Sequence, residues 1–363
     1  MTGRSEHKMP NGNRKINSLI KNVLFMCFAM LFFQQEALFA QVISNNGAAV
    51  SVTSGAAVTS KDALNNSGGT ISNGGTINLS GDYTNSSSTL GNGTFRIGRN
   101  WTNSGTFYID TYLNASTVIF NGADNQSIIR TGGETFYNLS IENSGAQLSK
   151  TISLPNDVTI MGTLFMYLGY VNATAYKLYL SNNIPSALNY TSVTGSRIIG
   201  KFERGLNSVP GTYLFPLGSL AHYNPANIRT NSVSSPGTIL SEFVTSPPPG
   251  NSGLPFADPP VEVFREYPDG FWDLKANGFS TGDYSINLNG TGFADTIFDI
   301  TRVIKRTNNG PWTVEGTHAA ADTINKVVYR NNLAGNIDPS GTQFALARVR
   351  PLILSHPVSL IVC

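Results

Sequence analysis

A short phrase recurs along the first half of this chain and limits the folds open to it: a glycine, a threonine and an apolar residue, set off by asparagine and serine. The stretch Asn65–Asn85 reads NNSGGTISNGGTINLSGDYTN and holds two copies. Apolar residues never keep a 3.6-residue period for three turns, so the pattern predicts short strands separated by turns. The copies are Gly69-Thr70-Ile71, Gly75-Thr76-Ile77, Gly93-Thr94-Phe95, Gly105-Thr106-Phe107 and Gly162-Thr163-Leu164.

Strands this short and this frequent favour a β-solenoid, in which the chain winds one strand per face and then turns a corner. Corners need residues that tolerate positive φ, as Gly and Asn do. Charged residues make up only 13% of the chain, about half of the ~25% usual for soluble domains. Stacked coils would place like charges ~5 Å apart, which explains their scarcity. A β-sandwich built from hairpins is the open alternative.

Composition divides the chain into zones. We expect an all-β protein with a parallel β-solenoid (β-helix) over residues 41–190, of which 41–64 form an N-terminal cap. At about 20 residues per coil this zone would hold about seven coils. An antiparallel β-sandwich follows over 191–349, with a Pro-rich loop at 245–260, and covers the other end of the solenoid. Its expected strands are Ser196–Phe202, Gly211–Pro216, Ala226–Asn231, Ile239–Val244, Gly270–Lys275, Asp283–Leu288, Asp299–Arg306, Trp312–Gly316, Lys326–Tyr329 and Gln343–Arg348.

The first forty residues have the pattern of a secretory signal peptide. A basic flank that includes Arg14 and Lys21 precedes the apolar run Val23–Phe33, and Ala40 stands before the expected cleavage. An uncleaved membrane anchor is the alternative. This segment carries the excess positive charge, so after cleavage the chain is nearly neutral and we expect neither a membrane span nor a nucleic-acid partner. Cleavage also removes Cys27, so no internal disulfide can form.

Motifs of the common catalytic and metal sites are missing. The histidines His222, His318 and His356 stand alone, without a second ligand at metal spacing. The chain has no HExxH, no GxSxG and no phosphate loop, and Cys363 is its last residue. We therefore expect no catalytic residue, no cofactor-binding residue, no metal ligand and no cofactor, and we expect that the protein is not an enzyme.

One charged group in the solenoid zone could form a site. Arg96, Arg99 and Arg130 could lie near Asp110 and Asp124 on neighbouring coils. Solenoid enzymes that cut polysaccharides need clustered carboxylates or a basic residue in a groove. A solvated face explains these scattered charges better.

The three tryptophans have two interpretations. Trp101, Trp272 and Trp312 could form flat platforms on which a sugar stacks. Tryptophan more often fills the edge of a core, and we expect that role for all three.

Several phrases resemble a known family. In the first zone they are similar to the β-strand repeat of large secreted surface proteins of the Bacteroidota, and in the second zone to the domain that often follows it. The resemblance covers about residues 100–349. Its phrases are Trp101-Thr102-Asn103-Ser104-Gly105-Thr106-Phe107, Thr117-Val118-Ile119-Phe120-Asn121-Gly122, Phe136-Tyr137-Asn138-Leu139-Ser140-Ile141, Val158-Thr159-Ile160-Met161-Gly162-Thr163-Leu164, Gly200-Lys201-Phe202-Glu203-Arg204, Tyr213-Leu214-Phe215-Pro216-Leu217-Gly218, Tyr223-Asn224-Pro225, Gly270-Phe271-Trp272, Lys305-Arg306 with Pro311-Trp312, and Phe344-Ala345-Leu346-Ala347.

The resemblance implies export and display on the outer cell surface, commonly through type IX secretion, in adhesin-like proteins. It implies a structural role without catalysis: a stalk that holds binding modules, with surface glycans, host or matrix proteins and the secretion machinery as partners. The alternative is a carbohydrate-active protein, either a polysaccharide lyase or hydrolase or a glycan-binding module, that uses the solenoid groove. Residues 350–363 resemble the first strand of an Ig-like module, which implies that the chain is a fragment of a longer protein.

Overall fold

A computed structural model describes residues 42–110, 112–191 and 195–352. The expected signal peptide and most of the tail 350–363 lie outside these residues. The described chain is all-β, as expected, and its one helical element is the single 3₁₀ turn η1 (Pro185–Ala187). A parallel solenoid comes first and an antiparallel sandwich follows. Strand pairing through residues 65–180 is parallel throughout the described ladders, so the hairpin alternative is wrong for this zone.

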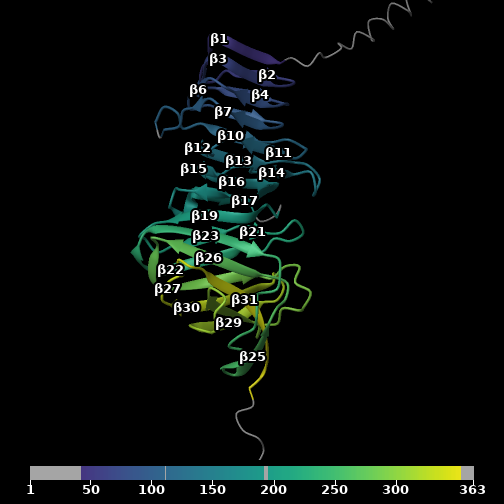
Figure 1. The fold of residues 1–363 in the computed structure, drawn as a ribbon, viewed down its shortest axis with the longest axis vertical. Helices are drawn as coiled ribbons and strands as arrows, with labels where there is room; N and C mark the ends of the chain where they lie inside the picture. Colours follow the sequence, from purple (N-terminus) through teal and green to yellow (C-terminus); the bar gives the residue numbers. More distant parts are fainter. Residues whose placement is uncertain (1–41, 111, 192–194, 353–363) are drawn as a thin grey trace, which may run out of the picture. The chain divides into compact units, whose positions relative to one another are not determined.

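One face of the solenoid is a seven-stranded parallel sheet to which each coil gives one strand (Figure 1). Successive coils are offset by 18 residues between Thr76 and Thr94, and by 25 between Leu139 and Leu164. The coil length is therefore close to expectation at first and grows along the chain. The strands are β2 (Ala57–Ser60), β4 (Thr76–Leu79), β7 (Thr94–Ile97), β10 (Thr117–Phe120), β13 (Asn138–Glu142), β16 (Leu164–Leu168) and β18 (Leu188–Tyr190).

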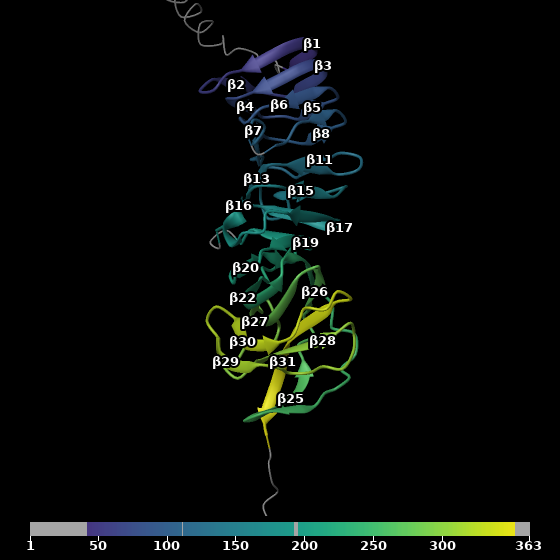
Figure 2. The same ribbon diagram turned by 90° about the vertical axis from the view of Figure 1, so that its left-hand side faces the viewer.

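The other faces of each coil carry either two short strands or one long strand that bends between them (Figure 2). The outermost coil contains β1 and β2, which pair in parallel with β3 and β4, so residues 42–64 extend the same ladders. These strands are β1 (Ile43–Val52), β3 (Leu64–Asn73), β5 (Tyr83–Asn85), β6 (Ser88–Leu90), β8 (Trp101–Asn103), β9 (Thr106–Phe107), β11 (Gln126–Ile129), β12 (Glu134–Phe136), β14 (Thr151–Ser153), β15 (Val158–Ile160), β17 (Tyr170–Leu180) and β19 (Arg197–Leu206).

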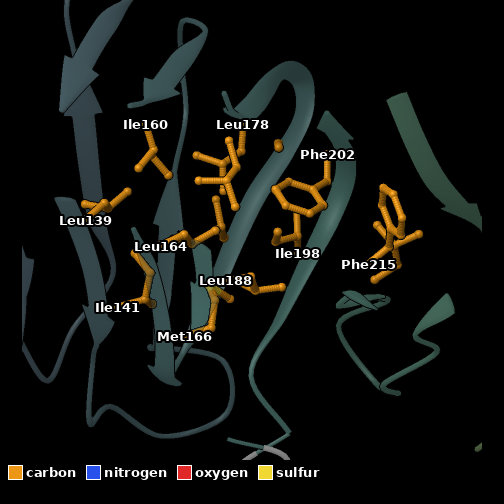
Figure 3. Close-up of a cluster of buried hydrophobic side chains, with 14 of the residues drawn as sticks. Leu139, Ile141, Ile160, Leu164, Met166, Leu178, Leu188, Ile198, Phe202 and Phe215 are labelled. Carbon is orange, nitrogen blue, oxygen red and sulfur yellow. The ribbon is translucent and has the colours of Figure 1, made fainter. Parts of the chain in front are cut away.

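The solenoid core is a stack of apolar side chains in register. Ile77 pairs with Phe95 on the next coil, and Leu139 pairs with Leu164 further along. Alternate residues of each strand point inward, and the inward ones are buried. Figure 3 shows the stack running on from Leu139 and Leu164 to Phe202 and Phe215, at the start of the sandwich. One continuous core therefore serves both parts.

Asparagine side chains form a second, polar stack inside the solenoid. The amide of Asn45 donates to Asn66 (2.9 Å), Asn66 to Asn85 (2.8 Å) and Asn85 to Asn103 (3.0 Å). All four are buried. Burial of an amide is tolerated only where its hydrogen bonds are satisfied, and the neighbouring coil supplies the partner here. Asn103 donates to the carboxylate of Glu134 (2.8 Å), where the series ends.

The strand β19 belongs to both parts of the molecule. One edge pairs in parallel with β17, the last long strand of the solenoid. Residues Phe202–Leu206 pair on the other edge with β23 (Gly237–Val244), and this pairing is antiparallel. The solenoid ends on the sandwich, and backbone pairing joins β1 to β31 (Thr342–Pro351) in one 19-stranded sheet.

The sandwich packs the antiparallel end of that sheet against a five-stranded antiparallel sheet. Its core includes Trp272, Tyr284 and Phe344, all fully buried. The remaining strands of the large sheet are β21 (Leu217–Gly218), β24 (Phe256–Asp258), β25 (Val261–Glu266), β26 (Phe271–Asn277) and β28 (Arg302–Thr307). The five-stranded sheet contains β20 (Thr212–Phe215), β22 (Ala226–Ser235), β27 (Ser280–Asn289), β29 (Thr317–Asp322) and β30 (Val327–Ala334).

Two expectations about the sandwich strands are wrong. Trp312–Gly316 is not a strand, because it follows a turn in which Asn308 and Asn309 both have positive φ, and only Thr313 forms an isolated bridge. The strand begins afterwards, at β29. The Pro-rich segment 245–260 is a loop only in its first part, since β24 lies within it and pairs with β25. The other expected strands are present, with shifted ends.

Candidate functional site

The tryptophans lie in the core, as expected, and none is a platform for sugars. Trp101 and Trp272 are fully buried and Trp312 is 2% exposed. The indole of Trp101 donates to Glu134 (2.8 Å), and that of Trp272 donates to a backbone carbonyl (2.8 Å). These polar contacts lock the rings in place inside the protein.

The possible cluster of Arg96, Arg99 and Arg130 with Asp110 and Asp124 is not what the ion pairs of Arg96 and Arg130 show. Arg96 pairs instead with Glu142 (3.1 Å) on the outer face, two coils away. Arg130 pairs with the buried Glu134 (2.8 Å).

Asp110 serves its own loop. Its carboxylate accepts hydrogen bonds from the backbone N–H groups of Tyr112 and Leu113 and from the side chain of Asn114. These bonds lower the pKa of Asp110 to about 2. The carboxylate therefore stabilises the turn of its own loop.

The histidines stay apart. His222 is exposed, and its ring lies against Gly292. One ring nitrogen of His318 is 3.0 Å from the carbonyl of Asp299, and burial, together with the charges of Arg302 and Arg330, lowers its pKa. His356 lies outside the described residues. Within those residues, no three His, Cys, Asp or Glu side chains come together as a metal site.

A cavity of about 500 Å³ opens where two strands diverge from β19. The first part of β19 pairs with β21, and the part from Phe202 onward pairs with β23. Between them lies Gly200, whose positive φ (+94°) and close approach to Thr174 leave no room for a Cβ. We call this cavity the fork cavity; its walls include Ile199, Gly200, Leu220 and Phe243.

Among the described residues that line the fork cavity, Glu242 has the only ionisable side chain. Burial raises its pKa, and the nearby Asp273 on β26 raises it further, whereas Lys201 and Lys275 oppose the shift. Cleavage of a glycosidic bond needs two carboxyl groups around the bond. Asp273 does not line the fork cavity, so its described walls present the carboxyl of Glu242 without a second one.

A second cavity, of about 330 Å³, lies beside β25 and β31 and the loop that precedes β28. We call it the aromatic pocket. Its apolar side comes from Phe264, Phe298 and Ile300, and the latter two are 58% and 42% exposed. Tyr267 lines it as well and donates its hydroxyl to the carbonyl of Thr296 (2.7 Å). Burial raises the pKa of Tyr267, so this hydroxyl stays protonated at neutral pH.

An ion pair forms the polar side of the aromatic pocket. Arg348 on β31 contacts the carboxylate of Asp295, and its guanidinium lies 5.6 Å from the centre of the Tyr267 ring. The side chains of Arg348 and Asp295 are 28% and 39% exposed, so both still reach solvent. The pocket thus combines an apolar surface with a paired acid and base.

Neither the fork cavity nor the aromatic pocket is predicted by the sequence. The fork cavity depends on a strand that changes partners part-way, and no local pattern marks such a change. The aromatic pocket joins the loop residues 295–301 to Arg348, about fifty positions later. One signal is present: Phe298 is an apolar residue outside the expected strands, where apolar side chains are unusual. Ile300 carries no such signal, because the sequence predicts a strand over Asp299–Arg306.

Comparison with known proteins adds no relative. The chain matches no protein family, no curated protein and no solved structure. In the part of the chain that the structure describes, no helix has the length and apolar character of a membrane span.

Proposed function

We propose that this protein is an exported, adhesin-like structural protein of the cell surface, in which the solenoid acts as a stalk and catalysis plays no part. The observation that carries the proposal is the strand β19, which pairs with the solenoid on one edge and with the sandwich on the other. Separate domains joined by a linker move relative to one another by default. A shared strand removes that freedom, which suits a spacer.

The distribution of charge and aromatic residues supports the same proposal. Two ion pairs of the solenoid join different coils: Arg96 pairs with Glu142, two coils away, and Lys177 pairs with Glu203 on the adjacent strand (2.5 Å). The tryptophans are in the core. A polysaccharide-cleaving groove would require clustered charges and exposed aromatic rings on one face.

Surface display is the property to measure first. Intact producing cells would be treated with an impermeant protease and probed with an antibody raised against residues 42–352. We expect the antibody to label intact cells and the protease to remove the signal. A strain without the gene would lose attachment to glycan-coated or matrix-coated surfaces. Signal found only after lysis would contradict the proposal.

The purified protein would be incubated in parallel with a panel of polysaccharides. We expect no new reducing ends and no unsaturated products. Either product would favour the carbohydrate-active alternative and would place catalysis on this chain.

A further inference from the structure

We propose that the aromatic pocket binds one pyranose residue of a neutral glycan. The inference does not rest on the proposed stalk function, because a stalk requires no ligand site of its own. It rests on the lining of the pocket: exposed aromatic carbon on one side and a partly exposed ion pair on the other. The sandwich then contributes recognition, independently of the solenoid.

The apolar side of the pocket matches the face of a sugar ring. Phe298 keeps 58% of its surface exposed and Ile300 keeps 42%, whereas most of the phenylalanines among the described residues are buried. One face of a pyranose presents mainly C–H groups, and burying them against an aromatic ring removes apolar area from water. A volume of about 330 Å³ is at the small end of ligand pockets, which suits one ring.

The polar side selects for hydroxyl groups. A carboxylate only accepts hydrogen bonds and a guanidinium only donates them. Asp295 and Arg348 are already in contact, so a ligand must bridge both without separating them. A hydroxyl donates and accepts at once, and can therefore bond to the acid and to the base together.

Charged ligands fit less well. An ammonium group would pair with Asp295 but repel Arg348, and a carboxylate would do the reverse. Either one would leave a partly buried charge without its partner, which is unfavourable. The lining residues carry one positive and one negative charge, so the pocket attracts neither sign. A neutral, hydroxyl-rich ligand remains.

The test uses the protein with its full chain and four soluble hexasaccharides: cello-, manno-, malto- and chitohexaose. Saturation-transfer NMR would detect binding, and titration would give Kd. We expect at least one of the four to bind. Phe298→Ala and Asp295→Ala should each weaken binding by about tenfold or more, which corresponds to ~1.4 kcal/mol. Ile324→Ala is the matched control, since Ile324 is 88% exposed and does not line the pocket.

Controls for folding and for ligand charge distinguish the possible outcomes. Thermal melting of each variant would verify that it folds; if Asp295→Ala unfolds, Asp295→Asn takes its place. The proposal is overturned if no neutral hexasaccharide binds, if the two pocket variants bind as well as the control, or if only polygalacturonate, added as a charged comparison, binds. Surface display of the protein would be unaffected by any of these results, so the stalk proposal stands or falls separately.

Discussion

Single buried residues set how the coils fit together. Glu134 is 2% exposed and ends the asparagine series, where it accepts from Trp101, Asn103 and Arg130 at 2.8 Å each. A carboxylate can take these donors because both of its oxygens only accept. The coils after Asn103 do not continue the asparagine series. Glu134 therefore accepts the hydrogen bonds of donors that would otherwise lack a partner.

Replacing Glu134 tests this role. Glu134→Ala should lower the free energy of unfolding by about 3 kcal/mol or more, because buried N–H donors lose their acceptor. Glu142→Ala is the control: it breaks an ion pair on the outer face and should change stability by less than about 1 kcal/mol. Urea unfolding of both variants is the measurement. Equal effects would show that Glu134 is not a structural acceptor.

Gly200 offers a test of the fork between β21 and β23. A Cβ at this position would lie 2.6 Å from the backbone of Thr174, at φ +94°. Gly200→Ala should therefore destabilise the protein by about 2 kcal/mol or more, from strain and overlap together. Gly55→Ala shares the positive φ (+81°) but meets nothing within 4 Å, so only the ~1 kcal/mol of backbone strain remains. Similar melting temperatures for the two variants would contradict the fork geometry.

At the scale of elements, one carboxylate joins the two sheets of the sandwich. Asp258 on β24 bonds to Arg302 on β28 (2.6 Å) and to Arg330 on β30 (2.8 Å). β28 belongs to the large sheet and β30 to the five-stranded sheet. Both arginine side chains are 2% exposed. Without Asp258, each buried guanidinium would lose the carboxylate that it pairs with.

Asp258→Asn should therefore lower the stability of the protein by about 3 kcal/mol at pH 7, since it breaks a buried ion network by removing one partner. Glu262→Gln is the control, because its ion pair with Arg350 is on the surface and contributes less than about 1 kcal/mol. Guanidinium chloride unfolding would compare them, with salt held equal among the samples. A small effect of Asp258→Asn would mean that the arginines find other partners.

The stability difference between wild type and Asp258→Asn should depend on pH. Burial alone would raise the pKa of Asp258, but hydrogen bonds and charge from Arg330 and Arg302 outweigh it, and the pKa is lowered. The ionised carboxylate therefore stabilises the fold above its unfolded-state pKa of about 3.9. That contribution is lost as the pH falls through the lower pKa of the folded state. The stability gap between wild type and Asp258→Asn should stay constant from pH 7 to about 5 and shrink below about 4. A gap that widens in acid would have the wrong sign.

At the scale of the whole molecule, the solenoid is a modular stack. Thr76 pairs with Thr94, Tyr83 with Trp101, and Ser88 with Thr106, so all three faces of this coil share one 18-residue offset. Each coil contacts mainly its neighbours, as in other repeat architectures. A spacer of this kind can change length without a change in fold.

Deleting one whole coil, residues 76–93, tests modularity. The strands β7 and β8 would then pair with β2 and β3, and Asn103 would follow Asn66 in the polar stack. We expect a folded protein with a cooperative thermal transition and a maximum dimension about 5 Å shorter by small-angle scattering. Deleting residues 76–84, half a coil, is the control and should prevent folding, because inward and outward faces no longer match. If both deletions unfold the protein, the coils are not interchangeable.

The sequence alone determined the class of fold and the direction of many side chains. Short strands such as β4 and β7 follow from local rules, since alternation of apolar and polar residues and Gly or Asn at corners act within a few residues. The core position of the tryptophans follows from the hydrophobic effect in the same way. These features need no knowledge of which coil lies next to which.

Which residues meet one another depends on how the coils stack. Coil length varies from 18 to 25 residues, so the neighbour of a given side chain depends on every insertion before it. Arg96 therefore pairs with Glu142 and not with Asp110, which is nearer in the sequence. The double role of β19, the bridge at Asp258 and the aromatic pocket likewise join segments far apart in the chain. Their energies come from packing and charge across the fold, and no local pattern of residues records them.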